Sequence, residues 1–225
     1  MRMRKKKHGA ERLARCAGYL VTEREDLPAF PLDLEIGCGK GDFVTGMALK
    51  YPDRRFLAVE RISDVLLIAA EKVGRAGLSP ERVKFAVTDA DRLGELLPPG
   101  SVERIYLNFS DPWPKARHAK RRLTHRGRLK TYASYLVPGG ELIFKTDNAG
   151  LFDFTLEELP AAGYEITYVT RDLHASELAA ENVMTEYERN FSEKGFRINM
   201  LRAVYDADKE IKEIKDTNNA KETAE

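Results

Sequence analysis

Pro31-Leu-Asp-Leu-Glu-Ile-Gly-Cys-Gly-Lys-Gly-Asp-Phe43 contains the clearest indication of the fold in this sequence. It reads as a short buried strand, a glycine loop and the start of a helix, the arrangement that binds nucleotides in open α/β sheets. Glycine lets the backbone turn tightly and approach a ligand, and the helix behind the loop begins with unpaired N–H groups. The stretch therefore predicts an open α/β sheet with a ligand site where this strand ends.

The spacing of the glycines distinguishes between ligands. Gly37, Gly39 and Gly41 form G-x-G-x-G, whereas dinucleotide folds use G-x-G-x-x-G to admit a pyrophosphate. Glu35 precedes the loop, and its charge would repel a pyrophosphate but suit a ligand with an ammonium group. S-adenosylmethionine is such a ligand, and we predict that Glu35 and the three glycines bind it. Cys38 is interpreted as a small filler, because no base lies near it in the sequence.

Two later strands are also followed by acidic residues. Residues 55–60 are predicted to form the second strand, and its last residue, Glu60, can accept hydrogen bonds from both ribose hydroxyls in this fold. Residues 83–87 are predicted to form the third strand, and Asp89 after it is placed to accept from an adenine amino group. A single aspartate at a strand end is usually a turn or cap residue, so the argument rests on the series.

The fourth predicted strand, residues 102–109, leads into Asn108-Phe-Ser-Asp-Pro-Trp-Pro-Lys115. Pro112 disfavours helix at the residue before it, so we expect the strand to end at Asp111 with an extended carboxylate. A carboxylate on a stiff turn, an indole beside it and cations downstream suit a site that binds a nucleobase on a phosphate backbone. Trp113, the only tryptophan, either shapes that base pocket or anchors the turn in the core.

Positive charge is concentrated in two segments. Residues 1–15 contain seven Lys and Arg against one Glu, and residues 115–130 contain eight and no acid, although the net charge is only +1. Both segments indicate polyanion binding, with a solvated surface as the plain alternative. No apolar run approaches the roughly 18 residues of a membrane span, and the Cys and His residues lack metal-ligand spacing. We therefore expect a cytoplasmic protein without a metal.

The remaining pattern completes a seven-stranded sheet in one domain. Further strands are predicted at residues 141–147, 164–170 and 196–205, and helices at 10–19, 63–75, 124–136 and 151–161, with another opening at Thr185. Thr124 is expected to cap the third of these helices, and Pro138-Gly-Gly140 to stop it. Because no linker divides the chain, residues 1–205 are predicted to form one domain with a basic arm at about 1–20. The polar residues 206–225 are expected to be a disordered tail.

The motifs taken together resemble those of bacterial tRNA (guanine-N7-)-methyltransferases, which are class I S-adenosylmethionine-dependent enzymes. The matching stretches run in the family's order: Leu34–Gly41, Val59-Glu60, Asp89-Ala90, Asn108–Lys115, Arg117–Arg122, Phe144–Asn148 and Thr185–Glu188. The resemblance implies a Rossmann-like, open, mostly parallel seven-stranded sheet with helices on both faces and a C-terminal antiparallel strand. It also implies methyl transfer to N7 of a guanosine in tRNA, at position 46 of the variable loop.

The resemblance also implies roles for individual residues. Those implied to contact the cofactor are Glu35, Glu60, Asp89 and Asp111, the last of which is also the implied catalytic residue. Those implied to contact the guanosine are Lys115, Asp147, Thr185, Glu186, Tyr187 and Glu188. Those implied to contact the tRNA are Arg117, His118, Lys120, Arg121 and Arg122. Thr185 and Glu188 also have the spacing of a capping box at a helix start, and both roles can coexist.

Guanine N7 carries a lone pair and no proton, so the implied reaction needs alignment of the reactants rather than a general base. Asp111, with Asp147 as its partner, is expected to stabilise the positive charge that develops on the purine. A methyltransferase of the same fold acting on another RNA position or on a protein is the nearest alternative. A non-catalytic RNA-binding protein is the other, although the intact acidic series argues against it. Monomer and homodimer both remain open.

Overall fold

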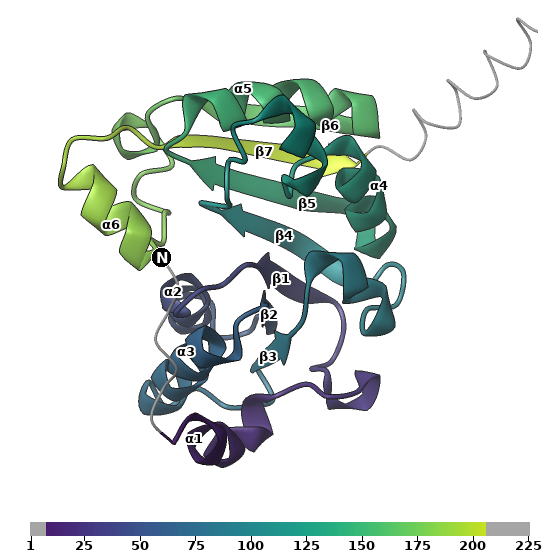
Figure 1. Ribbon diagram of the computed structural model, residues 1–225, viewed down its shortest axis with the longest axis vertical. Helices are drawn as coiled ribbons and strands as arrows, with labels where there is room; N and C mark the ends of the chain where they lie inside the picture. Colours follow the sequence, from purple (N-terminus) through teal and green to yellow (C-terminus); the bar gives the residue numbers. More distant parts are fainter. Residues whose placement is uncertain (1–7, 206–225) are drawn as a thin grey trace, which may run out of the picture.

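The computed structural model describes residues 8–205; residues 1–7 and 206–225, and with them the expected tail, lie outside the described part. Seven strands form one sheet in the order β3-β2-β1-β4-β5-β7-β6 (Figure 1). Their bounds are β1 Leu32–Ile36, β2 Phe56–Glu60, β3 Val83–Val87, β4 Val102–Asn108, β5 Leu136–Thr146, β6 Tyr164–Thr170 and β7 Asn199–Tyr205. Strands β1 to β5 pair in parallel, and β7 runs antiparallel to both β5 and β6. The predicted sheet with its antiparallel C-terminal strand is confirmed.

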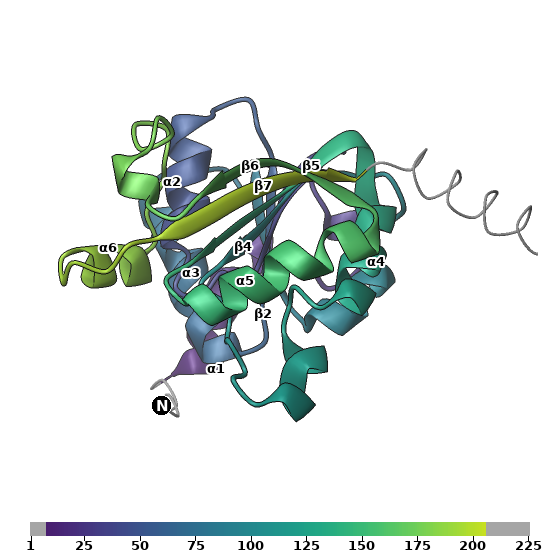
Figure 2. The same cartoon turned by 90° about the horizontal axis from the view of Figure 1, so that it is seen from above.

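Helices cover both faces of this sheet, as predicted, with α2 on one side and α4 and α5 on the other (Figure 2). The α-helices are α1 Gly9–Arg15, α2 Asp42–Lys50, α3 Ser63–Arg75, α4 Arg126–Tyr135, α5 Ala149–Glu158 and α6 Glu186–Ser192. Successive side chains of the central strand β2 point to opposite faces of the sheet. Leu57 packs in the core beneath α4 and α5, and Ala58 packs in the core beneath α2 and α3. The central strand β2 is apolar from Phe56 to Val59 because both of its faces are buried.

The parallel register brings the ends of β1, β2, β3 and β4 to one edge. Glu35 of β1 pairs with Ala58 of β2 and Tyr106 of β4, and Glu60 of β2 pairs with Val87 of β3. Glu35 and Glu60 near the ends of β1 and β2, and Asp89 just after β3, therefore lie along the same edge of the sheet, where ligands of open α/β sheets bind.

The fourth strand ends earlier than the sequence predicts. β4 stops at Asn108 instead of reaching Asp111, because Phe109 adopts a left-handed conformation with φ of 52° that breaks the ladder. The N–H of Phe109 still donates to the carbonyl of Lys145 at 2.9 Å before the chain turns away. Asp111 therefore lies in a turn outside the sheet.

Several predicted boundaries are also wrong. Thr124 does not cap α4: the cap is His125, whose Nδ1 accepts from the N–H of Gly127, while Thr124 is buried with its hydroxyl against Thr155. Pro138-Gly-Gly140 does not stop α4, because β5 already begins at Leu136 and contains these residues. The first helix ends at Arg15 and is followed by a short 3-10 turn, Ala17–Tyr19.

Among residues 8–205, no helix has the length and apolar content to cross a membrane.

Candidate active site

Two adjoining cavities open at the edge where these strands end. The larger cavity, of about 540 Å³, is lined by Glu60, Asp89, Asp111, Trp113 and Arg121 among others. The smaller cavity, of about 390 Å³, is lined by Glu35, the glycine loop and residues 185–187. Gly37, Asn108 and Phe109 line both. All four predicted cofactor acids therefore lie in one continuous region.

The three glycines of the loop serve two purposes. Gly37 and Gly39 have φ of 82° and 54°, and a Cβ added at either would meet no atom within 4 Å, so the loop leaves open space beside it. A Cβ at Gly41 would lie 2.6 Å from Cβ of Ala69 in α3. The first two glycines thus leave room for a ligand, and the third lets α2 pack closely on α3.

Glu35 is the buried acid of the site, with only 3% of its surface exposed. Its Oε1 accepts from Nδ2 of Asn108 at 3.1 Å, while its buried Oε2 makes no hydrogen bond of ordinary geometry with the described residues. Burial raises the pKa of Glu35 to about 7, although the hydrogen bond from Asn108 and the positive charge of Lys145 both act to lower it. A cationic donor would satisfy this oxygen, so the residue fits the ammonium group of S-adenosylmethionine.

Glu60 and Asp89 occupy the ends of the next two strands in the larger cavity. Oε1 of Glu60 accepts from the N–H of Ile62 at 3.0 Å, which fixes the carboxylate at the strand end. Asp89 caps the 3-10 turn η3, Ala90–Glu95, and accepts from the N–H of Asp91 at 3.2 Å. Asp89 therefore caps a turn, as aspartates after strands usually do, and it also lines the larger cavity.

The turn around Asp111 is strained and held from behind. Phe109 and Trp113, on either side of it, have φ of 52° and 41°, conformations that are unfavourable for bulky residues and are found at functional sites. Arg122 donates from Nε to the carbonyl of Pro112 at 3.0 Å and from Nη2 to the carbonyl of Trp113 at 3.1 Å. Its guanidinium also lies 4.2 Å from the ring centre of Phe154. Asp111 itself is exposed and lines the larger cavity.

Trp113 lies outside both hydrophobic core clusters, so the structure places it in the cavity wall rather than as a core anchor. His118 meets its ring edge-on at 5.8 Å between ring centres, and the guanidinium of Arg121 lies 5.0 Å over it. Both come from the 3-10 turn η4, Ala116–Arg121.

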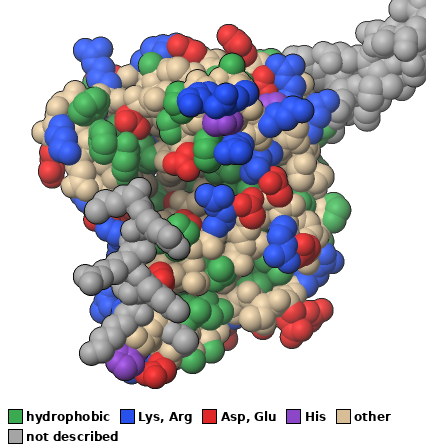
Figure 3. Space-filling view, in the orientation of Figure 1, with side chains coloured by type: hydrophobic (Ala, Val, Ile, Leu, Met, Phe, Trp, Pro, Cys, Tyr) green, Lys and Arg blue, Asp and Glu red, His purple; other side chains and the backbone are tan. Residues whose placement is uncertain are grey.

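The predicted tRNA-binding residues divide into two groups. Arg117, Lys120 and Arg121 are exposed, and Lys and Arg side chains gather over this part of the molecule (Figure 3). Arg122 instead points inward to the turn around Asp111. Lys115, predicted to contact the guanosine, is exposed just before η4 and lines neither cavity.

The segment 185–188 has a different role at each residue. Thr185 caps α6 by accepting from the N–H of Glu188 at 2.9 Å. The second hydrogen bond of the predicted capping box, from the N–H of Thr185 to the side chain of Glu188, is not formed, so that part of the prediction is wrong. Glu186 pairs with Lys40 of the glycine loop at 2.9 Å, and the hydroxyl of Tyr187 donates to Oδ2 of Asp147 at 3.3 Å. Thr185, Glu186 and Tyr187 line the smaller cavity, and Glu188 does not.

Glu188 is fully buried and paired with Lys145 of β5. Nζ of Lys145 lies 2.7 Å from Oε2 of Glu188, and Oε1 lies 2.9 Å from Nε2 of His174. Asn182 donates to the same Oε1. Burial raises the pKa of Glu188, but Lys145, His174 and Asn182 outweigh it, and the pKa is lowered overall. Lys145 is a structural residue of the site that the motifs do not single out, although a lysine directly after the buried apolar residues 142–144 of β5 indicates a buried partner.

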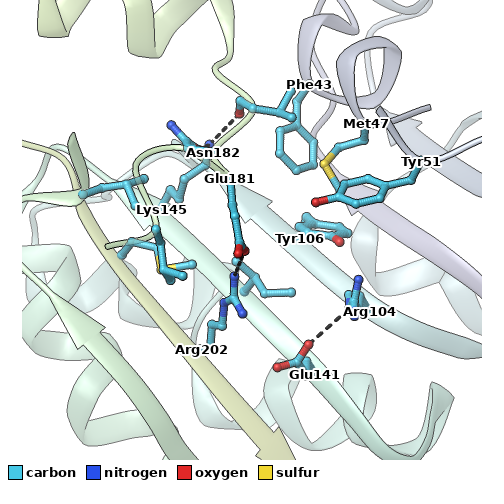
Figure 4. A pocket seen from close by; sticks show the side chains of 15 residues that line it. Phe43, Met47, Tyr51, Arg104, Tyr106, Glu141, Lys145, Glu181, Asn182 and Arg202 are labelled. Atoms are coloured by element: carbon cyan, nitrogen blue, oxygen red, sulfur yellow. Dashed lines mark hydrogen bonds and ion pairs between the residues drawn. The ribbon is translucent and has the colours of Figure 1, made fainter. Parts of the chain in front are cut away.

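A third cavity, of about 230 Å³, lies between α2 and the strands β4, β5 and β7 (Figure 4). Its charged side chains pair with one another: Arg104 with Glu141 at 3.1 Å and Arg202 with Glu181 at 3.7 Å. Lys145 lines it beneath the site. Because its charges are matched, this cavity offers no excess charge to a polar ligand. Residues 8–205 contain no group of three or more His, Cys, Asp or Glu that could bind a metal ion.

Comparison with known proteins agrees with this geometry. A methyltransferase family model, Methyltransf_4, matches residues 30–201. A protein of Lysinibacillus sphaericus named tRNA (guanine-N(7)-)-methyltransferase is 43% identical over 214 residues, covering 91% of this chain and 98% of that protein. A protein of the same name from Brevibacillus brevis is 48% identical over 173 residues, covering 77% of this chain and 80% of that protein.

Solved structures share the fold at lower identity. The 16S rRNA methyltransferase KamB matches with a TM-score of 0.59 at 15% identity, over 91% of this chain and 96% of that one. An antibiotic-related methyltransferase matches with a TM-score of 0.55 at 15% identity, over 90% and 95%. The chain therefore belongs to the methyltransferase family, as a relative of bacterial tRNA (guanine-N(7)-)-methyltransferases.

Proposed function

We propose that this chain transfers a methyl group from S-adenosylmethionine to N7 of a guanosine in tRNA. The observation that carries the proposal is the pair of adjoining cavities, which bring Glu35, Glu60 and Asp89 together with Asp111 and an exposed basic segment. The named relatives support the same activity, since they cover most of this chain. The acids suit a cofactor with an ammonium group, a ribose and an adenine, and the basic segment suits a phosphate backbone.

S-adenosylmethionine supplies, when bound, a methyl group activated by a sulfonium. Glu35 would accept from its α-ammonium, because its buried Oε2 makes no other hydrogen bond of ordinary geometry within residues 8–205. Glu60 would accept from the ribose hydroxyls and Asp89 from the adenine amino group in the larger cavity. Gly37 and Gly39 leave the space that such a ligand needs.

Asp111 would act on the guanine. Its carboxylate can accept from N1–H and N2–H of the base and stabilise the positive charge that methylation creates on the purine. N7 has no proton to lose, so the site chiefly aligns the base with the methyl donor, which can lower a barrier by roughly 7–11 kcal/mol. The hydroxyl of Tyr187 donates a hydrogen bond to Asp147, and the ring of Tyr187 lies 5.1 Å from that of Phe109, so Asp147 and Tyr187 would complete the proposed base site.

The exposed cations of η4 would bind tRNA phosphates next to the base site. A tRNA substrate would be available in the cytoplasm, which supports the expected localisation, and the family resemblance suggests position 46 of the variable loop as its target.

Nucleoside analysis tests the proposal. Purified protein, S-adenosylmethionine and an unmodified tRNA transcript should yield 7-methylguanosine, and mapping should place it in the variable loop. Methylation of another nucleoside, or of protein alone, would overturn the proposal. Binding of S-adenosylmethionine with no transfer to any tRNA would favour a non-catalytic RNA-binding role.

A further inference from the structure

Four aromatic side chains, Phe109, Tyr187, Phe191 and Phe196, form a continuous aromatic row. The ring centres of Phe109 and Tyr187 are 5.1 Å apart, Tyr187 and Phe191 are stacked at 4.1 Å, and Phe191 and Phe196 are 5.4 Å apart. The row joins β4 to α6 and to the loop that follows α6. Its first member, Phe109, lines both cavities of the active site.

The outer part of the aromatic row is open to solvent. Phe196 is 52% exposed and Tyr187 is 41% exposed, whereas most large apolar side chains of residues 8–205 are buried. Hydrophobic side chains gather on the surface over α6 (Figure 3). A row that starts in the cavities and ends in solvent would offer ring faces to whatever enters the site.

The element that carries the row is held firmly. Lys40 pairs with Glu186 and Arg189 pairs with Asp42, both at 2.9 Å, which ties α6 to the glycine loop and to α2. The buried contact between Lys145 and Glu188 ties α6 to the sheet. The rings are therefore presented in a fixed arrangement, which reduces the entropy lost when a partner binds.

We propose that the aromatic row stacks the tRNA bases that neighbour the target guanosine. This rests on the proposed function and extends it. A base that is modified inside a cavity has to leave the stack of the RNA, so its neighbours lose a stacking partner. Aromatic side chains replace such a partner in single-stranded RNA sites. Nζ of Lys194, 5.2 Å from the ring centre of Phe191, adds a positive charge for the adjoining phosphates.

The surroundings favour RNA over a second protein as the occupant. The row is continuous with the cavities through Phe109, and the exposed cations of η4 lie along the larger of these cavities, where Arg121 lines its wall. An RNA strand that delivers its guanosine between them would thus meet cations on one side and ring faces on the other. A surface that binds a second copy of this chain needs neither feature.

Phe196→Ala tests the proposal, with Phe196→Tyr as the conservative variant. Phe30→Ala is the matched control, since Phe30 is 42% exposed but precedes β1 at the opposite end of the strand from Glu35. We expect Phe196→Ala to weaken tRNA binding roughly tenfold at every salt concentration, because stacking adds to affinity without releasing counterions. Phe196→Tyr should restore binding, and Phe30→Ala should leave it unchanged. Calorimetry should show unchanged affinity for S-adenosylmethionine in all three.

Other outcomes would overturn the proposal. Unchanged tRNA affinity in Phe196→Ala would remove the row from RNA binding, and a flattened salt dependence would assign the effect to charge. A smaller particle mass for Phe196→Ala than for wild type would assign the surface to a second copy of the chain. Failure of this proposal can be distinguished from failure of the proposed function. If the wild-type protein forms 7-methylguanosine and Phe196→Ala binds tRNA with normal affinity, only the stacking role is refuted.

Discussion

At the scale of single residues, the site contains carboxylates in opposite environments. Glu35 is buried with an oxygen that makes no hydrogen bond of ordinary geometry in the described part of the chain, whereas Asp111 is exposed on a strained turn. Burial suits Glu35 to a partner that brings its own positive charge. Exposure suits Asp111 to a substrate that arrives neutral and becomes positive during the reaction. The two acids are thus expected to respond differently to substitution and to pH.

Asp111→Asn should lower the rate of methyl transfer by a hundredfold or more, while affinity for S-adenosylmethionine changes less than threefold. The amide keeps the shape of the side chain but loses the charge that stabilises the developing cation, an effect of roughly 3 kcal/mol on the barrier. Single-turnover kinetics beside calorimetry measure both quantities. Equal losses in rate and in cofactor affinity would instead make Asp111 a cofactor-binding residue.

Affinity for S-adenosylmethionine should depend on pH through Glu35. Its raised pKa of about 7 means that the folded protein retains this proton above the ordinary range of a carboxyl group. Its contribution to stability is therefore complete below about pH 4.5 and is lost as pH rises through about 7. An ammonium ligand needs the ionised form, so binding should be about tenfold tighter at pH 8 than at pH 6. Glu35→Gln should bind more weakly and without this dependence; a wild-type affinity that does not vary with pH contradicts the assignment.

Among the structural elements, the helix α6 and the Asp-Pro-Trp turn are each held in place by a cationic side chain that lies outside the two cavities of the active site. Lys145 and Glu188 anchor α6 to β5, and Arg122 holds the Asp-Pro-Trp turn by its backbone carbonyls. Neither segment is long enough to be stable alone, since α6 spans only Glu186–Ser192. Their geometry depends on these contacts, so substitutions here should act on the site through its shape.

Glu188→Gln and Lys145→Met should each lower the free energy of unfolding by about 3 kcal/mol, because each leaves a buried charge without its partner. The double variant Lys145→Met with Glu188→Leu should recover much of this loss. Urea denaturation measures the effect, and Asp153→Asn, which breaks an exposed pair with Arg171, is the control that should change stability by less than about 1 kcal/mol. A fully stable Glu188→Gln that no longer methylates tRNA would show that Glu188 contacts the guanosine directly.

Arg122→Ala should lower the methylation rate about tenfold or more without altering the salt dependence of tRNA binding, because its guanidinium binds the Asp-Pro-Trp turn rather than phosphate. Arg122→Lys, which keeps the charge with fewer donors, should recover only part of the rate. Arg121→Ala is the neighbouring control: it should weaken tRNA binding and reduce the slope of log K against log salt by about 1. A reduced slope in Arg122→Ala would return this residue to the phosphate-binding surface.

At the scale of the whole molecule, the sequence predicts the framework better than the contacts that complete it. Periodicity and the glycine loop identify all seven strands, and the parallel order explains why Glu35, Glu60 and Asp89 share one edge. Proline alone does not predict the early end of β4, because Phe109 is left-handed and its ring packs against Tyr187 of α6, which is distant in the sequence. The capping pattern at Thr124 is misleading because its hydroxyl is buried against Thr155, 31 positions later in the sequence. The contact of Arg122 with the Asp-Pro-Trp turn is not visible in the sequence, since its hydrogen-bond partners are backbone carbonyls, which every residue has.

Methyl transfer to guanine N7 can be tested with tRNA transcribed with 7-deazaguanosine in place of guanosine. This analogue replaces N7 with a carbon and removes the lone pair that accepts the methyl group. We expect the normal transcript to be methylated and the 7-deaza transcript to accept no methyl group. The 7-deaza transcript should nevertheless inhibit methylation of the normal transcript by competing for the same surface. Methyl incorporation into the 7-deaza transcript at the normal rate would contradict the account, because another atom would then be the acceptor.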